Sequence, residues 1–234
     1  MKKMIINSFY NTLIDKEDAI SLSTMLEIER VRKNGCKFVI VTNRSAKELE
    51  FYNRDFPFID YIISYNGNYV LNVENNKCLI DEKLREKDVE YIKEEYKNHK
   101  KIFYSLNENY CDDILCNDIY KIEIELSPRE VKKIKLINNE YLKSSIFIYN
   151  KKYYLEITSA KSTNSKAAEL ILKLENIKKS DVVTILGNDS EIDLLKYIKD
   201  SYVVSNAKEI KKISTNKTKS NNAKGSENII KKIQ

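Results

Sequence analysis

Polar and charged side chains that could bind an anion gather at a few points of the chain, each next to an apolar run. These points are residues 8–12, 42–44, 64–67 and 187–191, together with a helix start at residues 165–166. If the apolar runs are parallel strands, the points meet at the carboxyl edge of one sheet, where open α/β sheets bind ligands. Lysine, arginine and helix N-termini all favour anions, so the sequence predicts a phosphate-binding cluster there.

Five apolar runs indicate the strands that would position these residues. They cover residues 4–9, 36–41, 59–65, 181–186 and 202–204. Nearly continuous apolar runs are typical of parallel strands that are covered on both faces. Segments with helical periodicity or capping residues fall between them, near residues 22–31, 45–48 and 167–174, and a last helix is expected at 227–233. This order predicts a doubly wound α/β core formed by residues 1–80 and 161–234.

The pattern changes between about residues 81 and 160. Residues 119–126 alternate between apolar and charged side chains, as in a strand with one wet face. Ser127-Pro128-Arg129-Glu130 is a capping box with proline at the first helical position, so we expect a helix that runs to about residue 142. A hairpin is expected at residues 146–157. This part reads as an α+β domain inserted into the core.

Taken in order, the motifs resemble those of the Cof-type branch of the haloacid-dehalogenase (HAD) phosphatases over nearly the whole chain. The family's Asp-x-Asp-Gly-Thr-Leu falls on residues 8–13, its strand ending in Thr or Ser on Thr42, its Ser-x-Asn-Gly on residues 64–67, its Ser-Lys-Gly on residues 165–167, and its Gly-Asp-x-x-Asn-Asp on residues 187–192. A weaker match to the closing Ser-Asn-x-x-x-Gly lies at residues 220–225. The resemblance implies a Rossmann-like core with an inserted α+β cap.

The resemblance also implies the roles of single residues. In the family, Thr42 and Lys166 would hold the phosphoryl oxygens, and the lysine would also orient the nucleophile. We expect phosphate binding by Thr12, Thr42, Arg44, Asn66 and Lys166.

The residues that differ from the family's motifs stand at the positions expected to perform the chemistry. Ser8 stands at the place of the aspartate that attacks phosphorus, and Tyr10 at the place of the general acid/base. A serine hydroxyl needs a neighbouring base, and the sequence indicates none. A phenol with a pKa near 10 is a poor general base at neutral pH. At the catalytic positions we therefore expect degenerate residues, Ser8 and Tyr10, beside Thr42 and Lys166.

The expected magnesium site is weakened as well. Magnesium prefers carboxylate oxygens together with water and substrate phosphate. Asn188 stands where a metal-binding aspartate belongs, and Ile192 replaces the final aspartate of the motif. Asp189 or Glu191 would have to substitute after a small shift of the loop. We expect magnesium, if it is the cofactor, to bind weakly or not at all.

Composition and charge bear on three further partners: nucleic acid, zinc and the membrane. The net charge is +6, and only residues 208–224 are locally basic, which makes nucleic acid the least favoured partner. Four cysteines without a Cys-x-x-Cys pair, and the single His99, argue against zinc and for reduced thiols in a cytoplasmic protein. No apolar run reaches membrane-spanning length, so we expect no membrane partner.

The sequence thus favours a HAD phosphatase-like protein with impaired catalysis, a pseudophosphatase that binds a phosphorylated small molecule or a protein partner. The alternative is an active magnesium-dependent hydrolase of small phosphorylated metabolites with a rearranged site. A second alternative is nucleic-acid binding through the basic C-terminal stretch.

Overall fold

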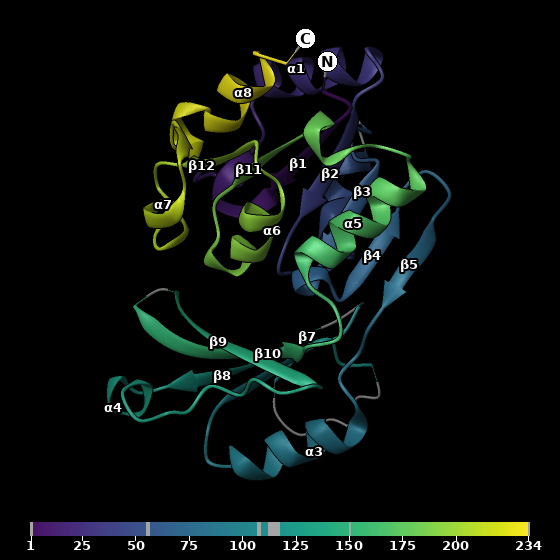
Figure 1. Ribbon diagram of the computed structural model, residues 1–234. Coiled ribbons are helices and arrows are strands. Elements are labelled where there is room, and N and C mark those ends of the chain that lie inside the picture. Colours follow the sequence, from purple (N-terminus) through teal and green to yellow (C-terminus); the bar gives the residue numbers. More distant parts are fainter. Residues whose placement is uncertain (1, 55–56, 107–108, 112–117, 150, 234) are drawn as a thin grey trace.

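The strands of the chain form two separate sheets. The computed structural model describes residues 2–233 except 55–56, 107–108, 112–117 and 150. Figure 1 shows a large sheet with its helices in the upper part of the view and a smaller sheet in the lower part. The strands of the large sheet, here called the core sheet, are in spatial order β13 (Asn216–Thr218), β12 (Ser201–Val204), β11 (Val182–Leu186), β1 (Met4–Ser8), β2 (Lys37–Val41), β3 (Tyr61–Ser64), β4 (Tyr69–Asn72) and β5 (Lys77–Asp81).

Strands β1 and β11 lie at the centre of the core sheet, and every residue of both is buried. Neighbouring side chains on a strand point to opposite faces, so both faces of the sheet must be covered here. The two strands are parallel, with Asn7 opposite Ile185. Their carboxyl ends therefore lie side by side, which brings Ser8 close to the loop that begins at Gly187.

Helices cover the core sheet, and four of them pack in two pairs. The helices are α1 (Leu22–Lys33), α2 (Glu50–Arg54), α5 (Asn164–Leu174), α6 (Ile192–Tyr197), α7 (Ile210–Ile213) and α8 (Gly225–Ile230). Helix α1 packs against α8 and β2, and α5 packs against α6 and β3. The Thr163 hydroxyl accepts a hydrogen bond from Lys166 N and so caps α5, which fixes the start of the helix that carries the predicted lysine.

The second sheet is antiparallel. Its strands are in spatial order β7 (Asn109–Cys111), β6 (Lys101–Tyr104), β8 (Lys121–Leu126), β10 (Lys152–Ser159) and β9 (Leu142–Tyr149), and its helices are α3 (Glu86–Glu95) and α4 (Pro128–Val131). A hydrophobic cluster of its own, which includes Ile92, Phe103 and Leu155, holds this sheet to α3.

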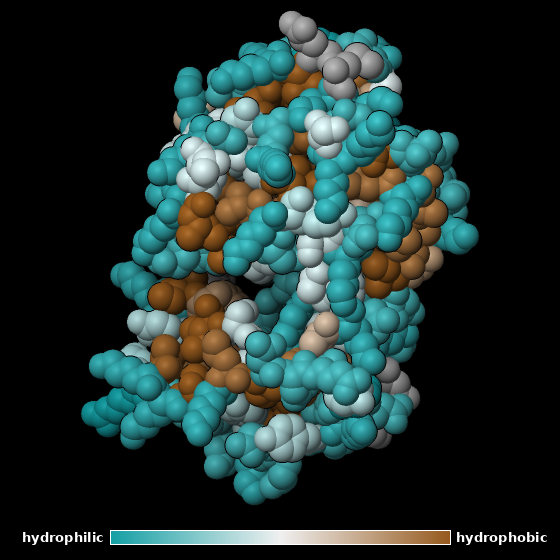
Figure 2. All heavy atoms as spheres, in the orientation of Figure 1, coloured by the Kyte–Doolittle hydropathy of each residue, from teal (hydrophilic) through white to brown (hydrophobic). Residues whose placement is uncertain are grey.

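The core sheet and the second sheet, with their helices, form two layers. These layers are joined by hydrogen bonds as well as by the chain. The Tyr65 hydroxyl donates to the carbonyl of Ser105 at 2.5 Å, and the Ser45 hydroxyl donates to the carbonyl of Leu106 at 2.6 Å. Tyr65 also stacks on Tyr120. Figure 2 shows a hollow between the upper and lower layers. The carboxyl edge of the core sheet faces the second sheet across this hollow (Figure 1).

The predicted doubly wound α/β core with an inserted α+β part is confirmed, but two strands were missed and one predicted helix is too long. The sequence did not indicate β4 and β5, which extend the core sheet with antiparallel strands. The capping box at Ser127 forms, but its helix ends at Val131 instead of residue 142. The reason is that β9 captures the following segment, because the Ser144 side chain accepts from Ile137 N and Asn138 bridges Lys143.

Cys36 and Cys78 are free thiols, whereas the Cys111 side chain and Cys116 lie outside the described residues. Among the described residues, the helices are too short or too polar to cross a membrane.

Gly67 provides a test of how the predicted Ser-x-Asn-Gly loop is held. Its φ is +92°, and a Cβ atom there would lie 2.2 Å from the carbonyl carbon and oxygen of Thr163. We expect Gly67→Ala to lower the free energy of unfolding by about 2–4 kcal/mol, because backbone would have to move. Gly35 is the matched control, since its φ is +83° but nothing lies within 4 Å. Gly35→Ala should cost about 1 kcal/mol in urea denaturation. Equal losses for the two variants would contradict the close contact.

Candidate functional site

The predicted nucleophile position is joined to a carboxylate. The Ser8 hydroxyl, at the end of β1, donates a hydrogen bond to Oε1 of Glu191. The other carboxylate oxygen, Oε2, accepts from the backbone N–H groups of Gly187 at 3.1 Å and Asn188 at 3.0 Å. The expectation that Ser8 has no base beside it is therefore wrong. The base comes from residue 191, which the fold brings next to β1 through the parallel pairing with β11.

Asn188 completes this cluster. Its side-chain Nδ2 donates to Glu191 Oε1 at 3.0 Å and lies 3.4 Å from Ser8 Oγ and 3.3 Å from the carbonyl oxygen of Tyr10. Three oxygens thus surround one amide nitrogen. Asn188 and Glu191 also form a capping box, so the turn before α6 is capped by Asn188.

The cluster is closed to solvent. Ser8 is 0% exposed and Glu191 is 2% exposed. Burial raises the pKa of the Glu191 carboxyl, although its hydrogen bonds from Ser8 and Asn188 oppose this shift. Four donors on one buried carboxylate are the arrangement that a buried anion requires. As it stands, the cluster holds an internal anion and offers neither Ser8 nor Glu191 to a ligand.

Tyr10 points away from the cluster. Its backbone carbonyl stays near Asn188, but its hydroxyl donates to Glu48 Oε2 at 3.3 Å, and the Arg44 guanidinium lies 4.2 Å from the centre of its ring. Burial and the negative charge of Glu48 raise the pKa of Tyr10 to about 12. The sequence indicated Glu48 as part of the capping residues at 45–48 and not as a partner of Tyr10. The following residue, Asn11, has a φ of 59° at the place of the family's glycine, a conformation that asparagine tolerates.

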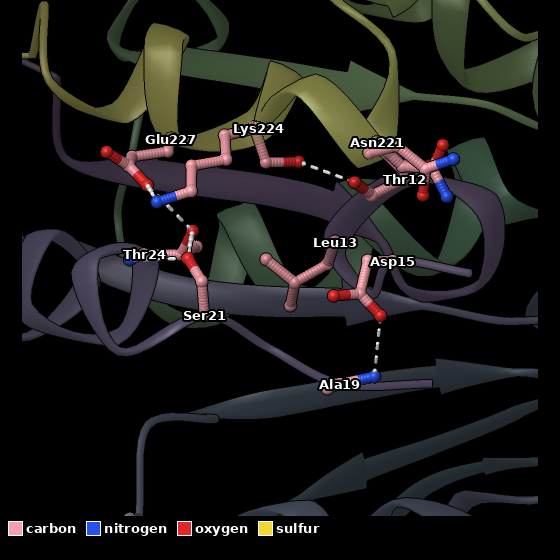
Figure 3. A pocket seen from close by; sticks show the side chains of 11 residues that line it. Thr12, Leu13, Asp15, Ala19, Ser21, Thr24, Asn221, Lys224 and Glu227 are labelled. Atoms are coloured by element: carbon pink, nitrogen blue, oxygen red, sulfur yellow. Dashed lines mark hydrogen bonds and ion pairs between the residues drawn. The ribbon is translucent and has the colours of Figure 1, made fainter. Parts of the chain in front are cut away.

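Thr12 is buried on the far side of this turn. It is 0% exposed, and its hydroxyl donates to the Tyr10 carbonyl at 3.3 Å. Figure 3 shows Thr12 beside Asn221, on the wall of a pocket of about 60 Å³, with Lys224 further along the wall near Glu227. The carboxylate of Glu227 on the same wall already accepts from Ser23 and Thr24. Thr12 and this pocket thus help to hold the turn to α1 and the C-terminal segment.

Two other predicted phosphate ligands are engaged in the structure. The Thr42 hydroxyl is buried and accepts from Arg44 N at 3.1 Å. Asn66 Nδ2 donates to Glu156 Oε1 at 2.7 Å, across the boundary between the two sheets. Burial raises the pKa of Glu156, and the positive charge of Lys121 opposes this. Asn66 therefore links the layers, a role that its position in the sequence did not indicate.

Lys166 and Asp189 lie outside the closed cluster. Lys166 is exposed, and its Nζ donates to the carbonyl of Lys161 at 3.1 Å. Asp189 is also exposed, and its side chain accepts a hydrogen bond from Ile210 N at 2.8 Å. This carboxylate therefore caps the start of α7. Of the predicted set, the structure brings together Ser8, Asn188 and Glu191. The spacing of Asn188 and Glu191 is that of a capping box, and it was the available signal that these two side chains face each other.

The closed cluster yields a test that needs no substrate. Glu191→Ala leaves its donors without an acceptor, so we expect a loss of about 2–4 kcal/mol in the free energy of unfolding. Added formate should restore part of this loss, because a small carboxylate fits the space and binds only the folded state. The control is Glu209→Ala, which removes an exposed carboxylate paired with Lys212. Thermal melts with and without formate would measure both variants. A melting temperature of Glu191→Ala that ignores formate would count against an anion held at this point.

Comparisons with other proteins show the family of this chain. A sequence profile of haloacid dehalogenase-like hydrolases matches residues 11–114 and 93–230. A Haemophilus influenzae protein named "Putative phosphatase" is 23% identical over 96% of this chain and 95% of its own length. The solved structure of a haloacid dehalogenase-like hydrolase from B. subtilis superposes with a TM-score of 0.86, at 16% identity, over 99% of this chain and 100% of that one.

A sugar phosphatase of HAD subclass IIB has the same fold. It superposes with a TM-score of 0.78 at 18% identity and covers 98% of both chains. The match to the family profile spans most of the chain, and the fold agrees with it. The chain therefore belongs to the haloacid dehalogenase-like hydrolase family, in its Cof-type branch.

Proposed function

We propose that this chain is a pseudophosphatase: a member of the phosphatase family that has lost phosphoryl-transfer chemistry and still binds a phosphorylated small molecule. The observation that carries the proposal is the hydrogen bond from the fully buried Ser8 hydroxyl to the Glu191 carboxylate. An attacking group must approach phosphorus in line with the leaving group. A side chain with no exposed surface cannot do so without a rearrangement of the loop at residues 187–191.

Glu191 does not rescue the chemistry as a nucleophile. Both of its oxygens accept hydrogen bonds from fixed donors, and the side chain is itself buried. It could serve as a base for Ser8, but a phosphoserine ester formed there would then need a second base and water to be cleaved. The arrangement is better explained as a neutral hydroxyl that helps to stabilise a buried anion.

Tyr10 is equally unsuited to proton transfer. A group works best as a general acid or base when its pKa lies near the working pH. A pKa of about 12 keeps the phenol protonated at neutral pH and makes it a weak acid. Its hydroxyl is also turned to Glu48, away from Ser8.

The residues of the cluster do not fit a magnesium ion. Phosphatases of this family generally use magnesium, which needs oxygen ligands. Here the amide nitrogen of Asn188 points at Ser8 Oγ, the Tyr10 carbonyl and Glu191, so a hydrogen-bond donor already serves the oxygens that face this space. Among the described residues, no group of three or more His, Cys, Asp or Glu side chains could hold a metal. We therefore derive no step through magnesium and propose that it binds weakly or not at all.

We further propose that residues 81–160 act as the cap of the family, set over the carboxyl edge of the core sheet formed by residues 1–80 and 161–234. The contacts of Asn66 with Glu156 and of Tyr65 with Ser105 support a closed arrangement. An active hydrolase would need Asp189 or Glu191 to leave its present partners. No observation favours nucleic-acid binding over these readings.

A pair of repaired variants tests the proposal. The first carries Ser8→Asp, Tyr10→Asp, Asn11→Gly and Asn188→Asp and keeps Glu191. The second adds Glu191→Asn and Ile192→Asp, the family's residues at those places. We expect the parent to turn over para-nitrophenyl phosphate with magnesium only at background rate. We expect measurable turnover in the second variant alone, because in the first the Glu191 carboxylate would crowd the new carboxylate at position 8.

Initial rates with and without magnesium, measured on protein of verified fold, decide the outcome. Fast magnesium-dependent turnover by the parent, abolished by Lys166→Ala but kept by Lys173→Ala, would overturn the proposal in favour of an active hydrolase. Lys173 is a matched control because it lies further along the same helix and pairs with Glu169 at the surface.

A further inference from the structure

Two lysine ammonium groups meet at the returning connection between the second sheet and the core. Lys143 belongs to β9 and Lys166 to the first turn of α5. Lys143 Nζ donates to the carbonyl of Ser162 at 2.8 Å, and Lys166 Nζ donates to the carbonyl of Lys161 at 3.1 Å. Consecutive carbonyl groups of one segment thus hold a cation from each layer.

Neither cation is neutralised by contact. In the described part of the chain, no carboxylate lies within ion-pair distance, 4.0 Å, of Lys143 or Lys166, whereas most other lysines with a fixed partner have such a contact. Burial lowers the pKa of Lys143, the negative charges of Asp193 and Glu156 oppose this from beyond ion-pair distance, and the positive charge of Lys166 adds a smaller lowering. Lys166 thus acts on Lys143, though more weakly than the two carboxylates do. A half-buried cation with only a carbonyl partner is costly unless something anionic joins it.

Unsatisfied polar groups lie along the same segment. Ser162 is 4% exposed, and its hydroxyl has no hydrogen-bond partner in the described structure, so it can donate to an anion. The side-chain oxygen of Asn164 is also unpartnered, but it is an acceptor and does not favour an anion. Asp193 already accepts from Ser165 N at 2.7 Å at the start of α5, so the helix terminus itself is taken. The groups at this place that lack an anion in contact are therefore the ammonium groups of Lys143 and Lys166.

We propose that Lys143 and Lys166 form a two-cation site for one phosphate group, which joins the second sheet to the core when it binds. The inference rests on the proposed binding of a phosphorylated small molecule and deepens it. Lys166 was expected from its motif position, whereas Lys143 is a specificity-determining residue that only the fold reveals. The site selects a phosphate dianion because two positive charges face one group.

Inorganic phosphate is the probe for this site. Calorimetric titration of the full chain should show binding that weakens as salt is added. Lys143→Met keeps most of the apolar stem but removes the charge, and we expect it to weaken phosphate binding about tenfold or more, as Lys166→Met should, because each removes a hydrogen bond to a charged group. Lys143→Arg should retain most of the affinity. Lys173→Met is the matched control and should bind phosphate like the parent.

Melting temperatures without phosphate separate a loss of folding from a loss of binding. If Lys143→Met does not fold, Lys143→Gln takes its place in the titration. No phosphate binding by the parent, or unchanged binding after removal of the charge at position 143, would overturn the two-cation site. Failure here is distinct from failure of the proposed function, since phosphate binding is measured without turnover. A parent that hydrolyses para-nitrophenyl phosphate would sink the pseudophosphatase and leave the lysine pair standing.

Discussion

The carboxylate of Glu191 is the point on which the candidate site depends. It accepts from the end of β1 through Ser8 and from the loop after β11 through Gly187 and Asn188. A buried anion is tolerated only when several donors converge on it, so this one side chain fixes the loop, the orientation of Ser8 and the start of the turn before α6. The space between Ser8, Asn188 and Glu191 is filled by the hydrogen bonds of these three side chains. The same contact explains why both Ser8 and Asn188 can be neutral residues here.

A second set of buried polar contacts holds the two sheets together. Asn66 reaches Glu156, which lies 3.8 Å from Lys121, and Lys121 in turn contacts Glu123 at 2.7 Å. Such groups are stable in the interior only when each has its partner, so the contact fixes one relative placement of the layers. Lys143 crosses the same boundary but is left with a carbonyl alone. The polar groups of the Ser8, Asn188 and Glu191 cluster are therefore paired, whereas Lys143 at the boundary between the sheets has a carbonyl partner alone.

The fold could be predicted from particular features of the sequence. Continuous apolar runs predicted the central strands. The alternation of apolar and charged residues before Ser127 predicted a second sheet with one solvent-exposed face. Strands β4 and β5 were not predicted because both strands are short and partly exposed, and their apolar and polar residues follow no clear period. The helix after Ser127 was overestimated because a capping box marks where a helix starts and says nothing of where tertiary pairing ends it.

The site was harder to predict because its decisive contacts span the chain. Ser8 and Glu191 are 183 residues apart, and no local pattern reports that they touch. Motif positions placed Ser8, Asn188 and Lys166 near one edge, but side-chain directions depend on packing. Tyr10 turned outward to Glu48, and Asn66 turned to the second sheet. Lys143 had no motif at all, because its importance arises from the way β9 lies against the returning segment.

The most direct measurement of the central claim is a crystal structure of the parent protein grown with magnesium and inorganic phosphate. The internal anion predicts that Glu191 keeps its hydrogen bonds to Ser8, Gly187 and Asn188, and that no magnesium ion lies between Ser8 and Asn188. A magnesium ion bound at that point, with Glu191 swung out of the cluster or with Asp189 turned inward as a ligand, would contradict the account.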